Sequence, residues 1–130
     1  MLAKKEMPIA PPIKFGMVDV RDVAKMHVAA LENNESIGKR FIISEGTYWA
    51  KEFAHKLVEI GYNAPTLSPP AFLVKFMAYF DKSLKMVKPV IGLDYTINSN
   101  SAKFLLGFDP ISFNKTVQDT SEYVKAIEAS

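Results

Sequence analysis

The run RFIIS, from Arg40 to Ser44, constrains the fold of this chain more than any other stretch. Its centre holds no polar residue, which is typical of a strand whose two faces are both covered. Such a strand needs a neighbour on each side and a layer on each face. The other candidate strands, 17–20 and 94–100, are short. We therefore predict that the chain carries only part of a sheet.

Helical patterns alternate with these strands. Asp22 is expected to cap a first helix, because apolar residues follow it at helical spacing through Leu31. Thr47 is expected to cap a second helix, which Gly61 ends in a left-handed conformation. The order of strands and helices predicts an α/β fold.

Three further helices are expected in the second half of the chain. The first starts at Ser68 and the two prolines after it, and its residues 71–80 are apolar almost all the way round, which predicts burial on most sides. A brief helix, capped by Ser99 or Ser101, ends at Gly107. The last helix is expected to bury a stripe from Phe113 to Ile127.

Composition narrows the class of protein. The chain has 48% hydrophobic residues, 23% charged residues and a net charge of +2, which is ordinary globular usage and too little excess charge for a nucleic-acid surface. The absence of cysteine excludes disulfides and thiolate-based metal or redox sites. The first residues, MLAKKEMPIAPP, do not form an apolar signal core. We expect a soluble, cytoplasmic protein without nucleic-acid or membrane partners.

The two histidines and the lysine run predict no site. His27 and His55 lie on different expected helices without carboxylates at metal-ligand spacing, so we expect both to be structural and assign no metal site. Lys82, Lys85 and Lys88 are expected to form a solvated face. Arg21 is equally compatible with contacting a substrate and with pairing to a surface acid.

Motifs along the chain resemble a known family. They are MVDVRDVAKMHVAAL, GKRFIIS, SAKFLLGFDP and TVQDTSEYVKA, in this order. Together they resemble the C-terminal portion of extended short-chain dehydrogenases/reductases, in the NAD-dependent epimerase/dehydratase superfamily, and especially its dihydroflavonol-4-reductase-like branch. The resemblance covers the chain from about Met1 to about Ala126. The chain departs from it at Ile111, where relatives often carry a basic residue.

The resemblance implies the C-terminal substrate-binding lobe of a Rossmann-like reductase, helix-rich, with a few short strands and an incomplete sheet. Residues 1–130 are expected to form this single lobe, and the dinucleotide-binding domain is expected to be absent from the chain. The glycines agree with this expectation, since those at 16, 38, 46, 61, 92 and 107 are all isolated. A dinucleotide site uses a glycine-rich turn whose amides approach the pyrophosphate.

The resemblance also implies where the catalytic residues should stand. Reduction in this family uses a tyrosine with a lysine four residues later, which lowers the pKa of the phenol so that it donates a proton. The pairs Tyr48 with Lys51 and Tyr79 with Lys82 have a different separation. We therefore assign no catalytic and no cofactor-binding residue to this chain.

By the same resemblance, the lobe supplies the wall of the substrate pocket beside the nicotinamide. The matching positions surround the proline-rich loop at the start of the chain: Pro8, Ile9, Pro11, Ile13, Phe15 and Met17. An apolar wall suits an aromatic or aliphatic carbonyl compound. Loops also carry proline and isoleucine simply to pack against their own scaffold.

These expectations describe the substrate-binding part of an NAD(P)-dependent reductase acting on a ketone or aldehyde, inactive in isolation, with NAD(P) bound by the parent protein. One alternative is the lobe of a sugar-nucleotide epimerase or dehydratase, which should offer arginines toward phosphate, whereas the wall holds only Lys14. Another alternative is a stand-alone, non-catalytic interaction module.

In isolation the chain is expected to form a homo-oligomer. An unpaired apolar strand such as 40–44 is a template for pairing with another chain. The aromatic face formed by Phe72, Phe76 and Phe80 is a second candidate contact. A symmetric dimer is the commonest closed arrangement.

Overall fold

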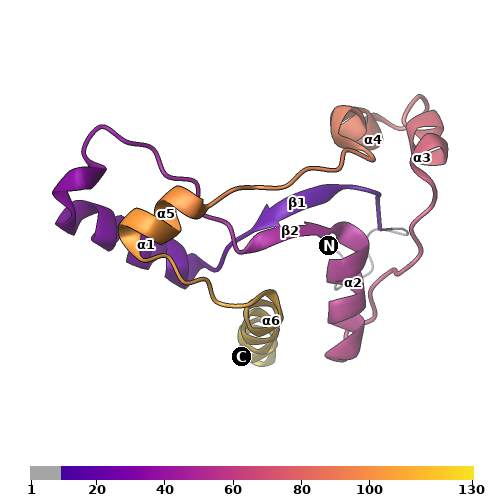
Figure 1. The fold of residues 1–130 in the computed structure, drawn as a ribbon. Helices are drawn as coiled ribbons and strands as arrows, with labels where there is room; N and C mark the ends of the chain where they lie inside the picture. The colour runs from indigo at the N-terminus through magenta and orange to yellow at the C-terminus, as the bar shows by residue number, and fades with distance from the viewer. Residues whose placement is uncertain (1–9) are drawn as a thin grey trace. The chain divides into compact units, whose positions relative to one another are not determined.

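The computed structural model describes residues 10–130, apart from the side chains at positions 83 and 84 (Figure 1). The elements in chain order are β1 (Lys14–Met17), α1 (Val20–Glu32), η2 (Asn34–Ser36), β2 (Gly46–Trp49), α2 (Ala50–Glu59), α3 (Ala71–Met77), α4 (Lys82–Val87), η3 (Lys88–Val90), α5 (Asn100–Leu106) and α6 (Phe113–Ala129). They form two compact units. Of the described residues, 10–15 and 48–95 make up the first unit, and 16–47 and 96–130 make up the second.

The sheet of the described residues consists of β1 and β2. The hydrogen bonds that flank it run from Ala50 N to Ile13 O (2.9 Å) and from Glu45 N to Met17 O (2.7 Å), which is an antiparallel register. The boundary between the two units crosses both strands. Among the described residues, no helix is long and apolar enough to cross a membrane.

The first strand and the cap of the first helix lie three residues earlier than the sequence pattern predicts. β1 ends at Met17, and Asp19, in an extended conformation, accepts a hydrogen bond from the amide of Arg21 as the N-cap of α1. The prediction that Asp22 caps this helix is therefore wrong. Asp22 lies inside the first turn, buried, and its Oδ2 accepts a hydrogen bond from the amide of Ile111 at 2.7 Å.

Residues 40–44 are not a strand, contrary to the prediction. Ser44 is buried and is held by Ser99, whose hydroxyl accepts from the amide of Ser44 (2.9 Å) and donates to its carbonyl (3.1 Å). The described residues provide no strand beside Phe41, Ile42 and Ile43, so the apolar run has no ladder to join. The expected strand at 94–100 is absent for the same reason.

Helix α2 begins later than predicted, because Thr47 lies in β2 and Trp49 occupies the N-cap position. The carboxylate of Glu52 accepts a hydrogen bond from the amide of Trp49 at 2.7 Å. The helix turns its small residues inward and places Phe53 edge-on to Phe15, with ring centroids 6.3 Å apart. The predicted stop is confirmed, since Gly61 has a φ of 94°.

The apolar segment 71–80 forms α3 as far as Met77 and a turn at 78–80, and α4 begins only after it, at Lys82. Val74 and Ala78 are buried, whereas Phe72, Phe76 and Phe80 are largely exposed. The prediction that this segment is buried on most sides is therefore wrong for the described chain. A helix that is apolar all round needs covering layers, and the first unit supplies one for only a narrow stripe.

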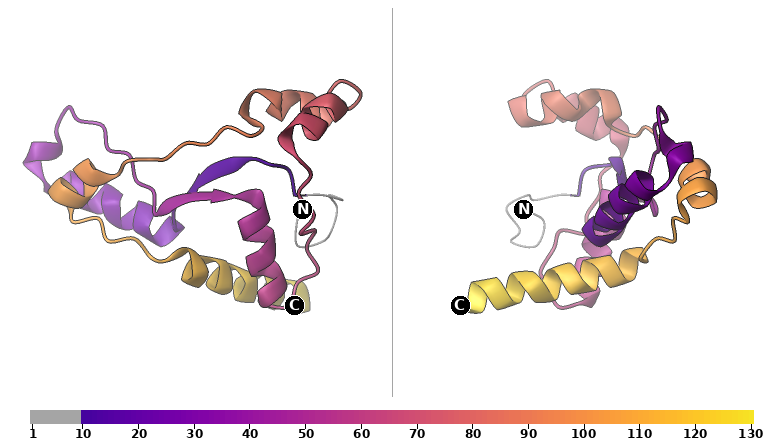
Figure 2. Two further views of the ribbon diagram at one scale, coloured as in Figure 1. Left: turned by 45° about the vertical axis from the view of Figure 1, so that its right-hand side comes forward. Right: turned by 90° about the vertical axis from the view of Figure 1, so that its left-hand side faces the viewer.

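The second unit is built from α1, α5 and α6. Helices α1 and α5 lie side by side in Figures 1 and 2, and the side-chain amide of Asn33, just after α1, donates to Leu105 O at 2.9 Å. The predicted end of α5 is confirmed, because Gly107 is left-handed with a φ of 65°. Ser99 occupies its N-cap position, but its hydroxyl bonds to Ser44.

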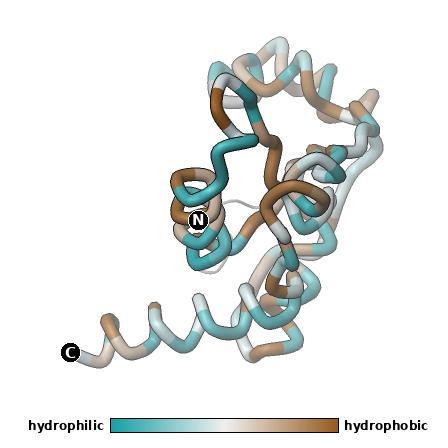
Figure 3. Tube along the Cα trace, turned by 60° about the vertical axis from the view of Figure 1, so that its left-hand side comes forward, coloured by the Kyte–Doolittle hydropathy of each residue, from teal (hydrophilic) through white to brown (hydrophobic). Residues whose placement is uncertain are grey.

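The expected buried stripe of α6 holds only in the first half of the helix. Val117 and Ser121 are buried, whereas Val124 and Ile127 are exposed. Figure 3 shows apolar positions recurring along α6 toward the C-terminus, beyond the part that is covered. The pattern predicts the helix correctly, but burial depends on which other elements are present.

Replacing Gly16 by Ala is expected to destabilise the second unit by about 0.5–1.5 kcal/mol, because the end of the half-buried Ile97 side chain must turn aside from its rotamer. A Cβ at Gly16 would stand 2.3 Å from Cδ1 of Ile97. Urea unfolding of Gly16→Ala, of Ile97→Val and of the double variant would measure this cost. The double variant should recover part of it, since the clashing methyl group is removed. Purely additive losses would exclude the clash as the cause.

Candidate functional site

The predicted substrate wall is divided between the two units. Pro8 and Ile9 lie outside the described residues. Pro11 is buried in the first unit, where Ile13 and Phe15 are half-buried, and Met17 belongs to the second unit.

The described residues of this wall in the first unit make contacts within their own scaffold. Phe15 packs against Phe53, the carbonyl of Ile13 accepts from Ala50, and the carbonyl of Pro12 accepts from Gly92 at 2.7 Å. These contacts agree with the alternative in which the loop packs on its own unit. The role of the wall in substrate binding stays a prediction.

Lys14 is the basic residue of this wall, and its charge is neutralised inside the first unit. Its Nζ pairs with Oδ1 of Asp94 at 2.5 Å and lies 5.6 Å from the centre of the Trp49 ring. The side chain is only 12% exposed. The hydroxyl of Tyr95 donates to the carbonyl of Lys14 at 2.8 Å and holds the backbone in place. The ammonium group of Lys14 is therefore already paired with Asp94 and packed over the Trp49 ring.

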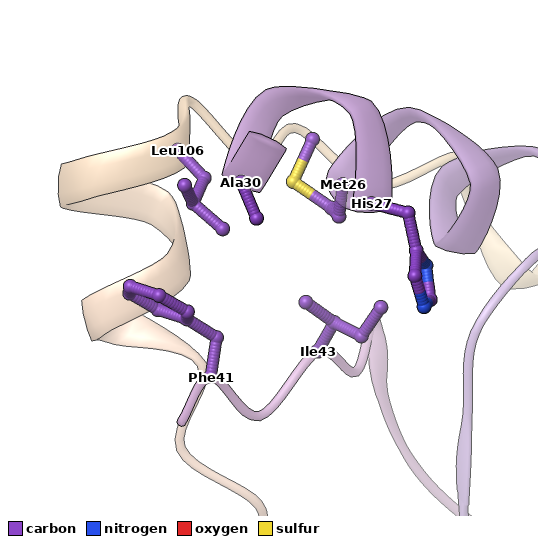
Figure 4. Close-up of a pocket in the computed structure, with 6 residues that line it drawn as sticks. All are labelled: Met26, His27, Ala30, Phe41, Ile43 and Leu106. Carbon is purple, nitrogen blue, oxygen red and sulfur yellow. The ribbon is translucent and has the colours of Figure 1, made fainter. Parts of the chain in front are cut away.

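The second unit has an open apolar hollow with a volume of about 160 Å³ (Figure 4). Its lining comes from α1, from the loop before β2 and from the end of α5: Met26, His27, Ala30, Phe41, Ile43 and Leu106. The sequence pattern alone does not predict a site at these residues. Periodicity could have indicated that some of these residues share a face. Met26 and Ala30 are one helical turn apart, and Phe41 and Ile43 are two residues apart in an extended segment.

His27 is the titratable group at this hollow. Its Nδ1 lies 2.7 Å from the carbonyl oxygen of Val23, which can only accept a hydrogen bond, so Nδ1 is the donor. No group of three or more metal-ligating side chains occurs among the described residues. A hollow of this size is smaller than the usual small-molecule site of about 300–1,000 Å³. It fits a single apolar side chain better than a substrate together with a nicotinamide.

A polar cluster joins the start of α1 to α6. The guanidinium of Arg21 donates to both carboxylate oxygens of Asp19 (2.6 and 2.9 Å) and pairs with Asp119 at 2.9 Å. The hydroxyl of Thr116 also donates to Asp19, at 2.8 Å. Of the two roles left open for Arg21, the structure therefore shows pairing with acids.

The charged groups of this cluster shift one another's pKa values. The hydrogen bond from Arg21 holds the pKa of Asp19 well below its usual range, despite the opposing effect of burial. The two carboxylates raise the pKa of Arg21. The pKa of Asp119 is lowered by its hydrogen bond from Lys115 and then by Arg21. Because these charges stabilise one another, we interpret the cluster as structural: it holds the start of α1 against α6.

Comparison with known proteins shows which proteins this chain is similar to in sequence and in fold. The chain is 29% identical, over 123 residues, to the NADPH-dependent methylglyoxal reductase GRE2 of Saccharomyces cerevisiae. It resembles the solved yeast methylglyoxal/isovaleraldehyde reductase Gre2 in complex with NADPH, with a TM-score of 0.67, 26% identity and 98% of the chain covered. No family model matches the chain. These similarities agree with the resemblance of the chain to extended short-chain dehydrogenases/reductases.

The match covers 91% of this chain but only 31% of the length of the yeast reductase, and 36% of the solved yeast structure. Gre2 of Candida albicans in complex with NADPH covers 87% of the chain with a TM-score of 0.59 and 26% identity. The crystal structure of gox2253 shares the fold, with a TM-score of 0.75 at 21% identity. These matches confirm the resemblance to the C-terminal part of such reductases and the helix-rich fold with an incomplete sheet.

Proposed function

We propose that this chain is the substrate-binding part of an NAD(P)-dependent reductase that reduces a ketone or an aldehyde. The nicotinamide cofactor and the catalytic tyrosine and lysine belong to the remainder of a longer, cytoplasmic parent protein of the dihydroflavonol-4-reductase-like branch. The relationship to reductases that are named as NADPH-dependent supports the cofactor and the type of reaction.

One contact supports this proposal over a sugar-nucleotide enzyme. A sugar-nucleotide pocket needs cations that are free to pair with phosphate oxygens. Lys14, the basic residue of the proposed wall, is already paired with Asp94 and packed over Trp49. A wall with this charge balance suits an uncharged carbonyl compound, bound through apolar contacts.

A chimera tests the proposal. This chain would replace the matching segment of yeast Gre2, and NADPH oxidation would be followed with aliphatic and aromatic carbonyl compounds. Conversion of a UDP-sugar, which consumes no reduced cofactor overall, would be followed by chromatography in the presence of NAD+. We expect turnover with carbonyl compounds and none with the UDP-sugar. NADPH binding by fluorescence would show that the chimera is folded. Turnover of the UDP-sugar alone would support the epimerase alternative, and a chimera that binds NADPH but reduces nothing would support the interaction module.

The isolated chain is expected to bind neither NADPH nor NADH, because a pyrophosphate cradle needs a glycine-rich turn before a helix. The isolated glycines of this sequence do not form one. Calorimetric titration, with full-length yeast Gre2 as the positive control, would measure this. Binding in the micromolar range by the chain alone would show that the cofactor site has been misplaced.

A further inference from the structure

We propose that Asp94 and Tyr95 are positioning residues for the substrate wall. They hold Lys14 in place, and with it residues 11–15, the part of the wall that lies in the first unit. Their role rests on the proposed function, which places this wall beside the carbonyl substrate. The contacts that support it all lie within the first unit.

A short segment that follows η3 contacts the wall at three points. The amide of Gly92 donates to the carbonyl of Pro12 at 2.7 Å. A carboxylate oxygen of Asp94 pairs with Nζ of Lys14 at 2.5 Å, and the hydroxyl of Tyr95 donates to the carbonyl of Lys14 at 2.8 Å. Two carbonyls and one ammonium group of the wall are therefore held by a segment 80 positions further along the chain.

The segment that makes these contacts is itself anchored in the first unit. Ile91, directly before it, is only 2% exposed. Gly92 has a left-handed φ of 73°, and a Cβ there would stand 2.9 Å from Cβ of Ala71, at the start of α3. Glycine allows both this conformation and this close approach. Because the segment is anchored, its contacts fix the position of the wall.

Tyr95 holds an edge of the wall that β2 does not reach. On the β2 side, the amide of Ala50 donates to the carbonyl of Ile13 at 2.9 Å. The carbonyls of neighbouring residues in an extended strand point to opposite edges, so the carbonyl of Lys14 points away from β2. The hydroxyl of Tyr95 bonds to this carbonyl and holds the backbone from the other edge.

The expected kinetic effect of these contacts differs from that of a general loss of stability. A wall that binds substrate through apolar contacts binds it less well when its backbone is displaced. In the proposed function the proton donor and the cofactor lie outside this chain, so KM for the carbonyl compound should rise while kcat is kept. A residue that only stabilises the fold would instead lower the fraction of active enzyme, which lowers the apparent kcat and leaves KM unchanged.

Tyr95→Phe in the chimera with yeast Gre2 tests this role, because it deletes only the hydroxyl group. At saturating NADPH, KM for a neutral carbonyl compound should rise roughly three- to tenfold, as expected for one lost hydrogen bond. NADPH binding, measured by fluorescence, should be unchanged and shows that the chimera is folded. Tyr79→Phe is the matched control and should leave KM unchanged, because Tyr79 is exposed in the same unit and contacts Lys88 through its ring.

Substitutions of Asp94 provide a second, independent measurement. Asp94→Ala should also raise KM, and Asp94→Glu, which keeps the charge, should restore KM toward the original value. The side chain of Asp94 is 73% exposed, so salt screens its pairing with Lys14. The effect of Asp94→Ala should therefore shrink as the salt concentration rises, whereas the effect of Tyr95→Phe should persist.

The outcomes separate this role from the proposed function. An active chimera in which Tyr95→Phe leaves KM unchanged, or lowers only kcat, overturns the positioning role and leaves the proposed function standing. Equal increases of KM for Tyr95→Phe and Tyr79→Phe also overturn it, because the response would not depend on the contact with Lys14. A chimera with the original chain that binds NADPH but reduces nothing overturns the proposed function and the positioning role together.

Discussion

Replacing Asp19 by Ala is expected to lower the free energy of unfolding of this chain by about 2–4 kcal/mol. The substitution removes the N-cap of α1, the paired hydrogen bonds from Arg21 and the hydrogen bond from Thr116. Because the side chain of Asp19 is only 4% exposed, water cannot readily replace these partners. Urea unfolding followed by circular dichroism would measure the loss.

Asp19→Asn is the matched control, because asparagine is a good helix cap but carries no charge. This variant should keep the contribution of the cap and lose that of the ion pair, so its stability should lie between those of the original chain and Asp19→Ala. Equal stability of Asn and Ala at this position would show that the cap contributes little. Equal stability of Asn and Asp would show that Arg21 contributes little.

The same carboxylate predicts the response to acid. Its pKa is lower in the folded chain than in the unfolded chain, because Arg21 stabilises the charged form. The folded state therefore binds this proton less readily, and stability falls as the pH falls. The contribution is fully present above the ordinary aspartate pKa of about 3.9 and is lost progressively below it. Unfolding at pH 7 and pH 3 should show a smaller difference for Asp19→Asn than for the original chain.

Replacing Asp22 by Ala is expected to cost about 1.5–3 kcal/mol, although Asp22 is not a helix cap. Its Oδ2 accepts from the amide of Ile111, a residue that is 89 positions away in the sequence. This contact ties α1 to the segment before α6, and the substitution leaves the amide without its partner. Thermal unfolding of the isolated chain would measure the effect.

Asp22→Asn keeps an oxygen that can accept from Ile111 and should lose less than half as much stability. A melting temperature unchanged by Asp22→Ala would contradict the structural role. In a chimera with a dinucleotide-binding half, an unchanged melting temperature together with a loss of turnover would instead indicate a catalytic role for Asp22.

Local patterns predicted the helices well because capping and periodicity are decided by neighbouring residues. Gly61 and Gly107 end their helices in the left-handed conformation, where glycine has no steric penalty. The start of α1 was placed incorrectly because Asp19 and Asp22 are equally suitable caps by residue type. The amide of Ile111 lies beside Asp22 only in the folded chain, and this contact leaves Asp19 as the cap.

The candidate site was less predictable from sequence than the helices. The neutralisation of Lys14 depends on Asp94, 80 residues further along the chain, and no local pattern indicates that pair. The hollow beside His27 combines residues from α1, α5 and the loop before β2, which only folding brings together. Periodicity indicated which residues share a face of their element, but not what that face contacts.

From residue types and their spacing alone, the sequence indicated the resemblance to reductases and most of the helices, because both are local properties of the chain. Tertiary structure decided whether RFIIS pairs as a strand and whether the aromatic segment after Pro70 is buried. Both are apolar enough for a protein interior, but the described residues supply neither strands to pair with the first nor a layer to cover the second. Burial is a property of two surfaces, and the sequence of one segment specifies only one of them.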